Sequence, residues 1–268
     1  MSRISETFTT LKSAGRKALV PFVTAGDPAP EHTVAILHAL VAGGADIIEL
    51  GVPFSDPMAD GPVIQLADER ALAHHVGLHH VLDIVKEFRK TNQNTPVVLM
   101  GYLNPVEAYG YEKFAADAKS VGVDGLLTVD LPPEAAAGLK AALQEKGIEA
   151  IFLMAPTTLE SRIKKIAEQA TGYLYYVSLK GVTGAGNLDA QAVKEKLETI
   201  RNITDLPVAV GFGIKDADTA ARIGALADGV VVGSALVNIV AELQHQPEKI
   251  APAITAFLSG LRQALDNL

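Results

Sequence analysis

One unit returns along the chain and limits the folds open to it: a helical stretch, a glycine turn, an acidic residue and a short apolar run. It reads AGGADIIELG, SVGVDGLLTVD, EKGIEAIFLM and ALADGVVVGS. Glycine suits a left-handed helix end, and a continuous apolar run is typical of a parallel strand buried on both faces. The sequence holds eight such runs: ALVPFVT, DIIELGV, PVVLMGY, GLLTVD, EAIFLM, GYLYYVS, PVAVGFG and GVVVGSA.

Strands that alternate with helices form right-handed βαβ units, and eight units in about 250 residues are the number of a (β/α)8 barrel. An open doubly wound sheet would carry a glycine-rich turn after the first strand, where this chain has TAGDPAPE. No linker or change of composition divides the 268 residues. We therefore predict an α/β fold with one domain, a TIM barrel over residues 1–268.

Helical spacing also marks both ends of the chain, which predicts an extra N-terminal helix and a closing C-terminal helix. Near the start the apolar residues are Ile4, Phe8 and Leu11. Near the end they are Ile254, Phe257, Leu258, Leu261 and Leu265.

Charge and composition exclude several classes of protein. The net charge of −8 disfavours a nucleic-acid or anionic-membrane partner, since either needs a basic face. Arg3, Glu6 and Lys12 interrupt any signal sequence, and the longest apolar runs fall short of the about 20 residues of a membrane span. Cysteine is absent from the sequence, which fits a reducing compartment. We expect a cytoplasmic protein.

Glu49 stands inside the apolar run DIIELGV. Side chains alternate along a strand, so Glu49 shares a face with Ile47 and Gly51, and the other face is covered by helices, where a carboxylate is costly. We expect Glu49 to point into the mouth of the barrel, where active sites of this fold lie and where desolvation favours its neutral form. The alternative is a glutamate paired with a buried arginine or lysine.

The loop after this strand, PFSDPMADGP, carries Asp56 and Asp60 between prolines that restrict its backbone. The two aspartates are either presented to a substrate or part of a solvated turn, because Asp-Pro and Asp-Gly are ordinary turn pairs. Composition does not choose between Asp56 and Asp60.

Glycines follow the last three predicted strands, in SLKGVTGAGN, GFGIKD and VVGSAL. Glycine lets backbone N–H groups approach an anion, and Ser234 adds a hydroxyl where a short helix could begin. Loops after strands seven and eight form a recurring phosphate site in this fold. We expect a phosphorylated substrate; the alternative is that these glycines serve tight turns only.

Three other features carry weaker signals. HHVGLHH could hold a metal, but solvated histidines in an exposed turn are favoured, and we expect no metal. Lys180 follows strand six, where a Schiff-base aldolase can carry its lysine, but it lies past the strand among glycines, so a loop lysine is favoured. Tyr175 lies on strand six and is expected to line the pocket.

Taken together, ELGVPFSDPMADGP followed by IQ, PFVTAGDP, GVTGAG, GFGI and VVGSA resemble the α subunit of tryptophan synthase. The segments stand in family order and at family spacing, essentially from end to end. The resemblance implies a retro-aldol cleavage of indole-3-glycerol phosphate to indole and glyceraldehyde 3-phosphate.

The resemblance also implies the residues of the site. It assigns the two catalytic carboxylates to Glu49 and Asp60, and thereby chooses Asp60 over Asp56. The implied indole pocket contains Phe22, Leu127 and Phe212, with Tyr175 at its edge. The implied phosphate site contains Gly184, Gly213, Gly233 and Ser234.

The family works as an α2β2 complex in which indole passes to a β subunit, so the resemblance implies this partner, with pyridoxal phosphate in the β subunit and no cofactor in this chain. Loops 53–62 and 179–188 would be lids. Where other members have Arg-Ser, this chain has Leu179-Lys180, and lysine lacks the bidentate fork of arginine. The implied partner-facing residues are Pro53, Asp56, Asn104, Pro132 and Lys180.

Two rival functions stay open at this point. One is another phosphate-binding barrel, such as a sugar-phosphate isomerase or a Schiff-base aldolase that uses Lys180. The other is a regulatory subunit that activates a β partner without catalysis, against which the presence of both Glu49 and Asp60 speaks.

Overall fold

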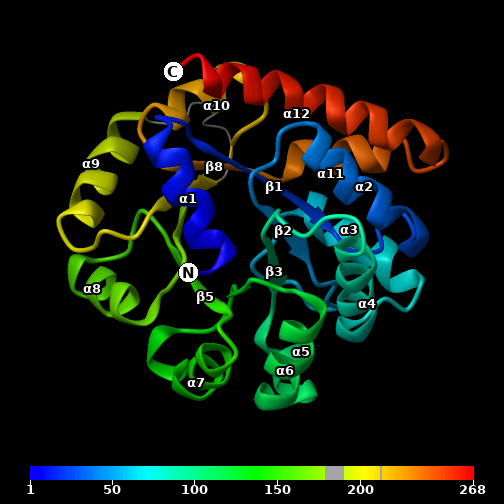
Figure 1. The fold of residues 1–268 in the computed structure, drawn as a ribbon, viewed down its shortest axis with the longest axis horizontal. Helices are drawn as coiled ribbons and strands as arrows, with labels where there is room; N and C mark the ends of the chain where they lie inside the picture. Colours follow the sequence, from blue (N-terminus) through cyan, green and yellow to red (C-terminus); the bar gives the residue numbers. More distant parts are fainter. Residues whose placement is uncertain (179–189, 212) are drawn as a thin grey trace.

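The computed structural model describes residues 1–178, 190–211 and 213–268. Within them, eight parallel strands pair in sequence order and close into a barrel, with β8 paired to β1. The predicted (β/α)8 barrel is confirmed, and Figure 1 shows its helices arranged around the strands. The strands are β1 (Ala18–Thr24), β2 (Ile48–Gly51), β3 (Val97–Gly101), β4 (Gly125–Thr128), β5 (Glu149–Met154), β6 (Leu174–Val177), β7 (Val208–Gly211) and β8 (Gly229–Val232).

The helices cover the outside of the barrel, and their buried faces pack on the outward-facing apolar side chains of the strands. Within the described ranges no helix combines the length and the apolar character needed to cross a bilayer. The helices are α1 (Arg3–Ser13), α2 (Pro30–Ala42), α3 (Pro62–Ala73), α4 (Leu78–Arg89), α5 (Leu103–Tyr109), α6 (Tyr111–Val121), η1 (Pro133–Ala135), α7 (Ala137–Glu145), α8 (Glu160–Gln169), α9 (Ala190–Arg201), α10 (Ala217–Gly224), α11 (Ser234–Glu242), η2 (Pro247–Lys249) and α12 (Ile250–Asp266).

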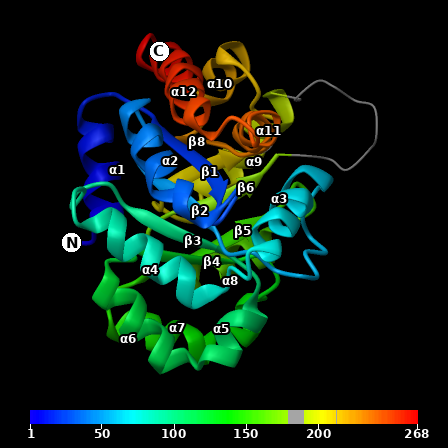
Figure 2. The same cartoon turned by 90° about the vertical axis from the view of Figure 1, so that its right-hand side faces the viewer.

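The N-terminal helix α1 closes the amino-terminal end of the barrel. Its buried residues Ile4, Phe8 and Leu11 belong to the same apolar cluster as the side chains that fill the barrel interior. The predicted N-terminal helix is confirmed. In Figure 2, α1 lies beyond one end of the strands and α3 lies near the other.

Ion pairs at low exposure attach these terminal helices to the barrel. Arg3 of α1 donates to Asp124 at 2.8 Å, and Arg89 donates to the other carboxylate oxygen of Asp124 at 2.7 Å. The predicted closing helix is α12, which packs on α2 and α10. Its Arg262 donates to Asp46, directly before β2, at 3.0 Å.

The register of β1 and β2 determines which residues meet at the mouth of the barrel. Phe22 of β1 pairs with Glu49 of β2, and Thr24 pairs with Gly51. A Cβ atom on Gly51 would lie 2.7 Å from Cζ of Phe22, so the ring occupies the space that glycine leaves. An aromatic side chain thereby lies next to the glutamate at this end of the barrel.

Candidate active site

Glu49 is fully buried, with a side chain that is 0% exposed. Its Oε1 accepts a hydrogen bond of 2.6 Å from the hydroxyl of Tyr173, directly before β6 on the other side of the barrel. The carboxyl group therefore lies inside the barrel. Its described partner is a neutral hydroxyl group, which differs from the alternative of a buried arginine or lysine.

Tyr173 lies between Glu49 and α1, the helix that closes the amino-terminal end (the floor) of the barrel. Its ring contacts Phe8 of α1 with centroids 5.6 Å apart. The α1 helix and the interior side chains of the barrel pack beneath Glu49. Within the described residues, Oε2 of Glu49 has no hydrogen-bond partner.

This environment changes the acid–base behaviour of Glu49. Burial raises the pKa of Glu49 from 4.5 to about 8, and the Tyr173 hydroxyl opposes that change to a smaller extent because it stabilises the anion. Glu49 is consequently a neutral acid at pH 7. A carboxyl group with a pKa near the working pH can both donate and accept a proton during a reaction.

Asp60 lies in the loop between β2 and α3 and is half-buried. Its Oδ2 accepts a hydrogen bond of 2.7 Å from the hydroxyl of Tyr102, which follows β3. That hydroxyl oxygen in turn accepts from the backbone N–H of Ala59 at 2.9 Å, and the ring of Phe54 stacks on the Tyr102 ring at 5.1 Å. Tyr102 thus attaches both ends of the loop that presents Asp60.

The two carboxyl groups share a neighbour in Tyr175. Burial, and after it the charges of Glu49 and Asp60, raise the pKa of the Tyr175 phenol well above its ordinary value. The Tyr175 hydroxyl crosses to β7, where a Cβ atom on Gly211 would lie 2.1 Å from it. Glu49 and Asp60 therefore have Tyr175 as a common neighbour.

Three of the predicted phosphate residues, Gly213, Gly233 and Ser234, lie just past the ends of strands seven and eight. Gly213 is exposed and has φ of +79°, a backbone conformation that favours glycine. Gly233 is the N-cap of α11, and Ser234 is its first residue, so the expected helix start at Ser234 is confirmed. Phe22 lies 3.7 Å from the position of a Cβ atom on Gly233, which places this helix start beside Phe22, the strand partner of Glu49.

The remaining predicted residues are either buried in the barrel, exposed around its mouth, or outside the described part of the chain. Leu127 of β4 is fully buried in the barrel interior, and Pro53 is buried directly after β2. Asp56, Asn104 and Pro132 are exposed around the mouth of the barrel. The predicted residues that lie outside the described part of the chain are Lys180, Gly184 and Phe212.

The histidines of HHVGLHH surround the start of α4. His79 and His80 stack with ring centroids 3.8 Å apart, and Nδ1 of His80 accepts from the backbone N–H of Gly77 at 3.2 Å. Across the described ranges no group of three or more His, Asp, Glu or Cys residues is arranged to hold a metal ion.

Two residues of the site, Tyr102 and Tyr173, were not among the sequence predictions. Tyr102 ends the predicted strand PVVLMGY, and a polar side chain at the end of a barrel strand is the signal that would have found it. Tyr173 precedes Tyr175 by two positions and so shares its inward face, which is the matching signal on the sixth strand.

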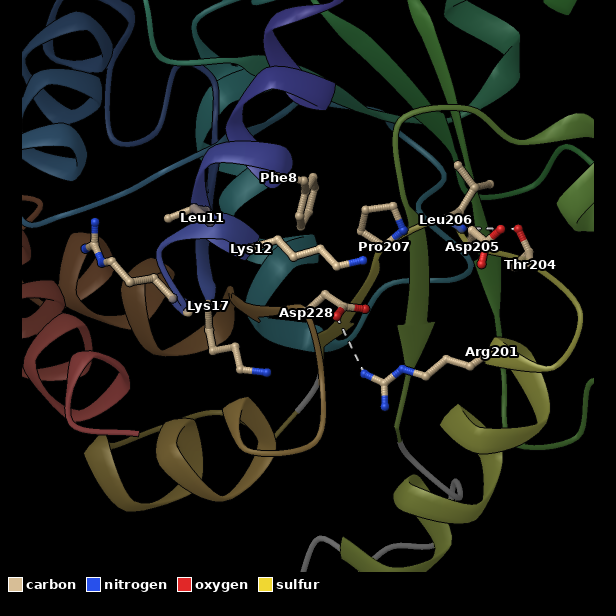
Figure 3. Close-up of a pocket in the computed structure, with 12 residues that line it drawn as sticks. Phe8, Leu11, Lys12, Lys17, Arg201, Thr204, Asp205, Leu206, Pro207 and Asp228 are labelled. Atoms are coloured by element: carbon tan, nitrogen blue, oxygen red, sulfur yellow. Dashed lines mark hydrogen bonds and ion pairs between the residues drawn. The ribbon is translucent and has the colours of Figure 1, made fainter.

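A separate cavity of about 370 Å³ lies at the amino-terminal end of the barrel, and Figure 3 shows its residues. Phe8 and Leu11 of α1 form its apolar wall, and Arg201 pairs there with Asp228 at 3.6 Å. Lys17 donates to the backbone oxygen of Ala227 at 2.8 Å. This cavity contains none of the predicted site residues and lies behind the floor that α1 forms.

Fold and site together define a (β/α)8-barrel protein with two carboxyl groups of different depth at the carboxyl ends of its strands. Comparison with known proteins gives the family. The family described as "Tryptophan synthase alpha chain" matches residues 8–266, and the chain belongs to it.

Individual relatives agree with this assignment. The tryptophan synthase alpha chain of Thioalkalivibrio sulfidiphilus is 62% identical over 266 residues, covering 99% of this chain and 100% of the relative. The crystal structure of tryptophan synthase subunit alpha from Legionella pneumophila str. Paris has a TM-score of 0.94 and 48% identity, with both chains fully covered. Tryptophan synthase from M. tuberculosis, in an aminoacrylate-bound form, has a TM-score of 0.88 and 35% identity, covering 99% of this chain and 100% of that chain.

Proposed function

We propose that this protein is a lyase that cleaves indole-3-glycerol phosphate to indole and glyceraldehyde 3-phosphate. The observation that carries the proposal is that a fully buried Glu49 with a raised pKa and a half-buried Asp60 have Tyr175 as a common neighbour. Two carboxyl groups in environments that differ this much are suited to two different tasks in one reaction.

The indole ring supplies the electron sink of the reaction. A proton added at C3 of the indole makes the ring an indolenine cation, and the bond from C3 to the first side-chain carbon then breaks. Its electron pair restores the aromatic ring, while the hydroxyl on that carbon loses its proton and becomes the aldehyde. One proton enters and one leaves, so the chain needs neither a lysine imine nor a cofactor for this step.

Glu49 performs both proton transfers in this mechanism. Because it is neutral at pH 7, it can give its proton to C3, and the resulting carboxylate can accept the proton of the side-chain hydroxyl. The unpartnered Oε2 is the atom available to the substrate, while Oε1 stays bonded to Tyr173 within the described structure. The cycle returns Glu49 to its starting acid form.

Asp60 stabilises the charge that develops during cleavage. Its carboxylate accepts a hydrogen bond from the indole N–H and lowers the energy of the cationic ring, an interaction that is strongest in the transition state. The Tyr102 hydroxyl keeps Asp60 in place at 2.7 Å. The indole ring then lies against the aromatic rings of Phe22 and Tyr175.

The phosphate group binds at the opposite side of the pocket. The first N–H groups of α11, beginning at Ser234, have no partner within the helix and form a partly positive end. Gly213 and Gly233 expose further backbone without a side chain in the way. Gly184, outside the described residues, is the remaining member of the proposed set.

A tryptophan synthase β subunit, which carries pyridoxal phosphate, is the proposed partner and receives the indole in an α2β2 complex. The exposed residues Asp56, Asn104 and Pro132 surround the mouth through which indole would leave. Met58, 84% exposed in the same loop, adds an apolar contact to this rim.

The test is to mix the purified protein with indole-3-glycerol phosphate and measure indole, with and without a β subunit. Indole formation that increases with the partner is the expected result. Absence of indole under both conditions overturns the proposed function. If borohydride treatment with substrate modifies Lys180, the protein is a Schiff-base aldolase and the proposed function is wrong.

A further inference from the structure

Asp68 of α3 is a buried carboxyl group that the mechanism above does not use. Its side chain is 4% exposed, and within the described residues its Oδ2 accepts one long hydrogen bond, of 3.4 Å, from the backbone N–H of Phe54. Phe54 is the residue whose ring stacks on Tyr102 at the start of the loop that presents Asp60. Asp68 therefore contacts the stem of that loop from inside the protein.

The charged groups that face Asp68 come from three elements. Asp60 faces it from the loop and Asp27 from the segment after β1, and both charges raise its pKa. Arg70, two positions along α3, is already engaged, because it donates to both carboxylate oxygens of Asp27 at 2.7 and 2.8 Å. The hydroxyl of Tyr102 is bonded to Asp60. Of these three carboxyl groups, Asp27 is the one that Arg70 bonds within the described residues.

The three carboxyl groups, Asp27, Asp60 and Asp68, differ in their hydrogen-bond partners, and this difference decides which of them keeps a proton most readily. Burial raises the pKa of all three carboxyl groups, and the bidentate arginine of Asp27 and the short hydrogen bond from Tyr102 to Asp60 oppose that rise. Within the described residues Asp68 has neither a cation nor a short hydrogen bond. Burial together with the two neighbouring charges raises the pKa of Asp68 to about 7.

We propose that Asp68 is a positioning residue for Asp60: its carboxyl group holds the stem of the loop at Phe54 and, by gaining or losing one proton, changes the electrostatic field in which Asp60 acts. When Asp68 is neutral, Asp60 acts without a second negative charge from α3. When Asp68 ionises, a second negative charge strengthens the stabilisation of a cationic ring at Asp60.

The first experiment needs no substrate. Carboxyl carbons are labelled with ¹³C in aspartate, the Asp60 resonance is identified by its loss in Asp60→Asn, and its shift is followed from pH 4 to pH 9. The wild-type resonance is expected to show a second inflection near pH 7. That inflection should vanish in Asp68→Asn, which keeps an acceptor for Phe54, and persist in Glu69→Gln, which removes an exposed charge from the same helix. A single inflection in the wild type overturns the inference.

The second experiment rests on the proposed function, because it measures cleavage of indole-3-glycerol phosphate against pH. Sites coupled by about one pK unit, a tenfold effect, give separable steps. In the wild type kcat is expected to rise up to about tenfold through pH 7, and Asp68→Asn is expected to lack this step while Glu69→Gln keeps it. A uniform loss in Asp68→Asn with an unchanged profile assigns a structural role only and overturns the inference. If the wild type forms no indole at all, the proposed function fails, and the carboxyl titration alone decides the role of Asp68.

Discussion

Replacing Glu49 with glutamine tests whether the fold holds this side chain as a neutral acid. Glutamine has nearly the same shape, and its carbonyl oxygen can still accept the hydrogen bond from Tyr173. The variant removes only the proton that Glu49 binds and releases. Any change in how stability depends on pH therefore reports the protonation of Glu49 itself.

The direction of the effect follows from the raised pKa. Between pH 4.5 and about 8 the folded chain keeps a proton on Glu49 that the unfolded chain has released. The free energy of unfolding consequently falls as the pH rises through this window. One pK unit corresponds to about 1.4 kcal/mol, so this group costs the wild type about 2.5 kcal/mol between pH 5 and pH 7.

The assay is urea unfolding of the wild type and Glu49→Gln at pH 5, 6 and 7. Asp68 and the other titrating groups are common to both proteins, so the difference between the two free energies isolates Glu49. We expect Glu49→Gln to gain about 2.5 kcal/mol relative to the wild type over this range. In the same variant, indole formation should fall by about 10²- to 10⁴-fold while substrate binding persists. A pH dependence that matches the wild type within about 0.5 kcal/mol would mean that Glu49 is ionised in the fold, and the reasoning about its role would be wrong.

Three further predictions follow from single contacts. Asp60→Asn keeps an acceptor for Tyr102 but loses the charge, so kcat should fall by about 10²- to 10³-fold with little change in KM. The control Asp56→Asn should keep the kcat of the wild type. Equal kcat in Asp60→Asn and the wild type would refute the electrostatic role of Asp60. Gly51→Ala places a Cβ atom 2.7 Å from Cζ of Phe22 and pushes the ring into the pocket. Titration calorimetry should therefore show several-fold weaker binding of indole. An unchanged affinity for indole would contradict this packing. Asp124→Asn leaves the buried Arg89 without its anion and should lower the free energy of unfolding in urea by about 3–5 kcal/mol. Glu87→Gln, in an exposed pair with Lys90, should leave that free energy nearly unchanged. Equal effects of the two variants would contradict the buried ion pair.

The strands were predictable because both faces of a parallel barrel strand are covered. Such a strand is a continuous apolar run, and the runs ALVPFVT and EAIFLM coincide with β1 and β5 from first to last residue. The other predicted runs extend one to three residues past the observed strands, as PVAVGFG does beyond Gly211. Apolar character continues beyond the last ladder pairing, so composition alone does not locate the end of a strand.

The orientation of Glu49 was also predictable, since alternation on a strand leaves two choices and the helical side is costly for a carboxyl group. Its partner was not. Tyr173 is 124 residues away along the chain, and Tyr102 is 42 residues from Asp60. These contacts depend on the strand register and on the width of the barrel, which no local pattern contains. Asp68 was not predicted for a different reason: it lies on the buried face of α3 with Ala67 and Ala71, and a helix sequence does not by itself tell a buried carboxyl group from an exposed one such as Glu69.

Their positions along the barrel axis explain why the carboxyl groups of Glu49 and Asp60 differ in burial. The interior layers and α1 fill the amino-terminal end, so a carboxyl group just above Tyr173 loses its water and keeps its proton. Asp60 lies in a loop that leaves it half-buried and gives it a hydroxyl donor, so burial raises its pKa while the Tyr102 hydroxyl opposes that rise. A chain that lacked the N-terminal helix would admit water beneath Tyr173 and lower the pKa of Glu49 toward that of an ordinary glutamate. The helix that closes this end of the barrel therefore helps to determine the protonation of Glu49, although it does not bond the carboxyl group itself.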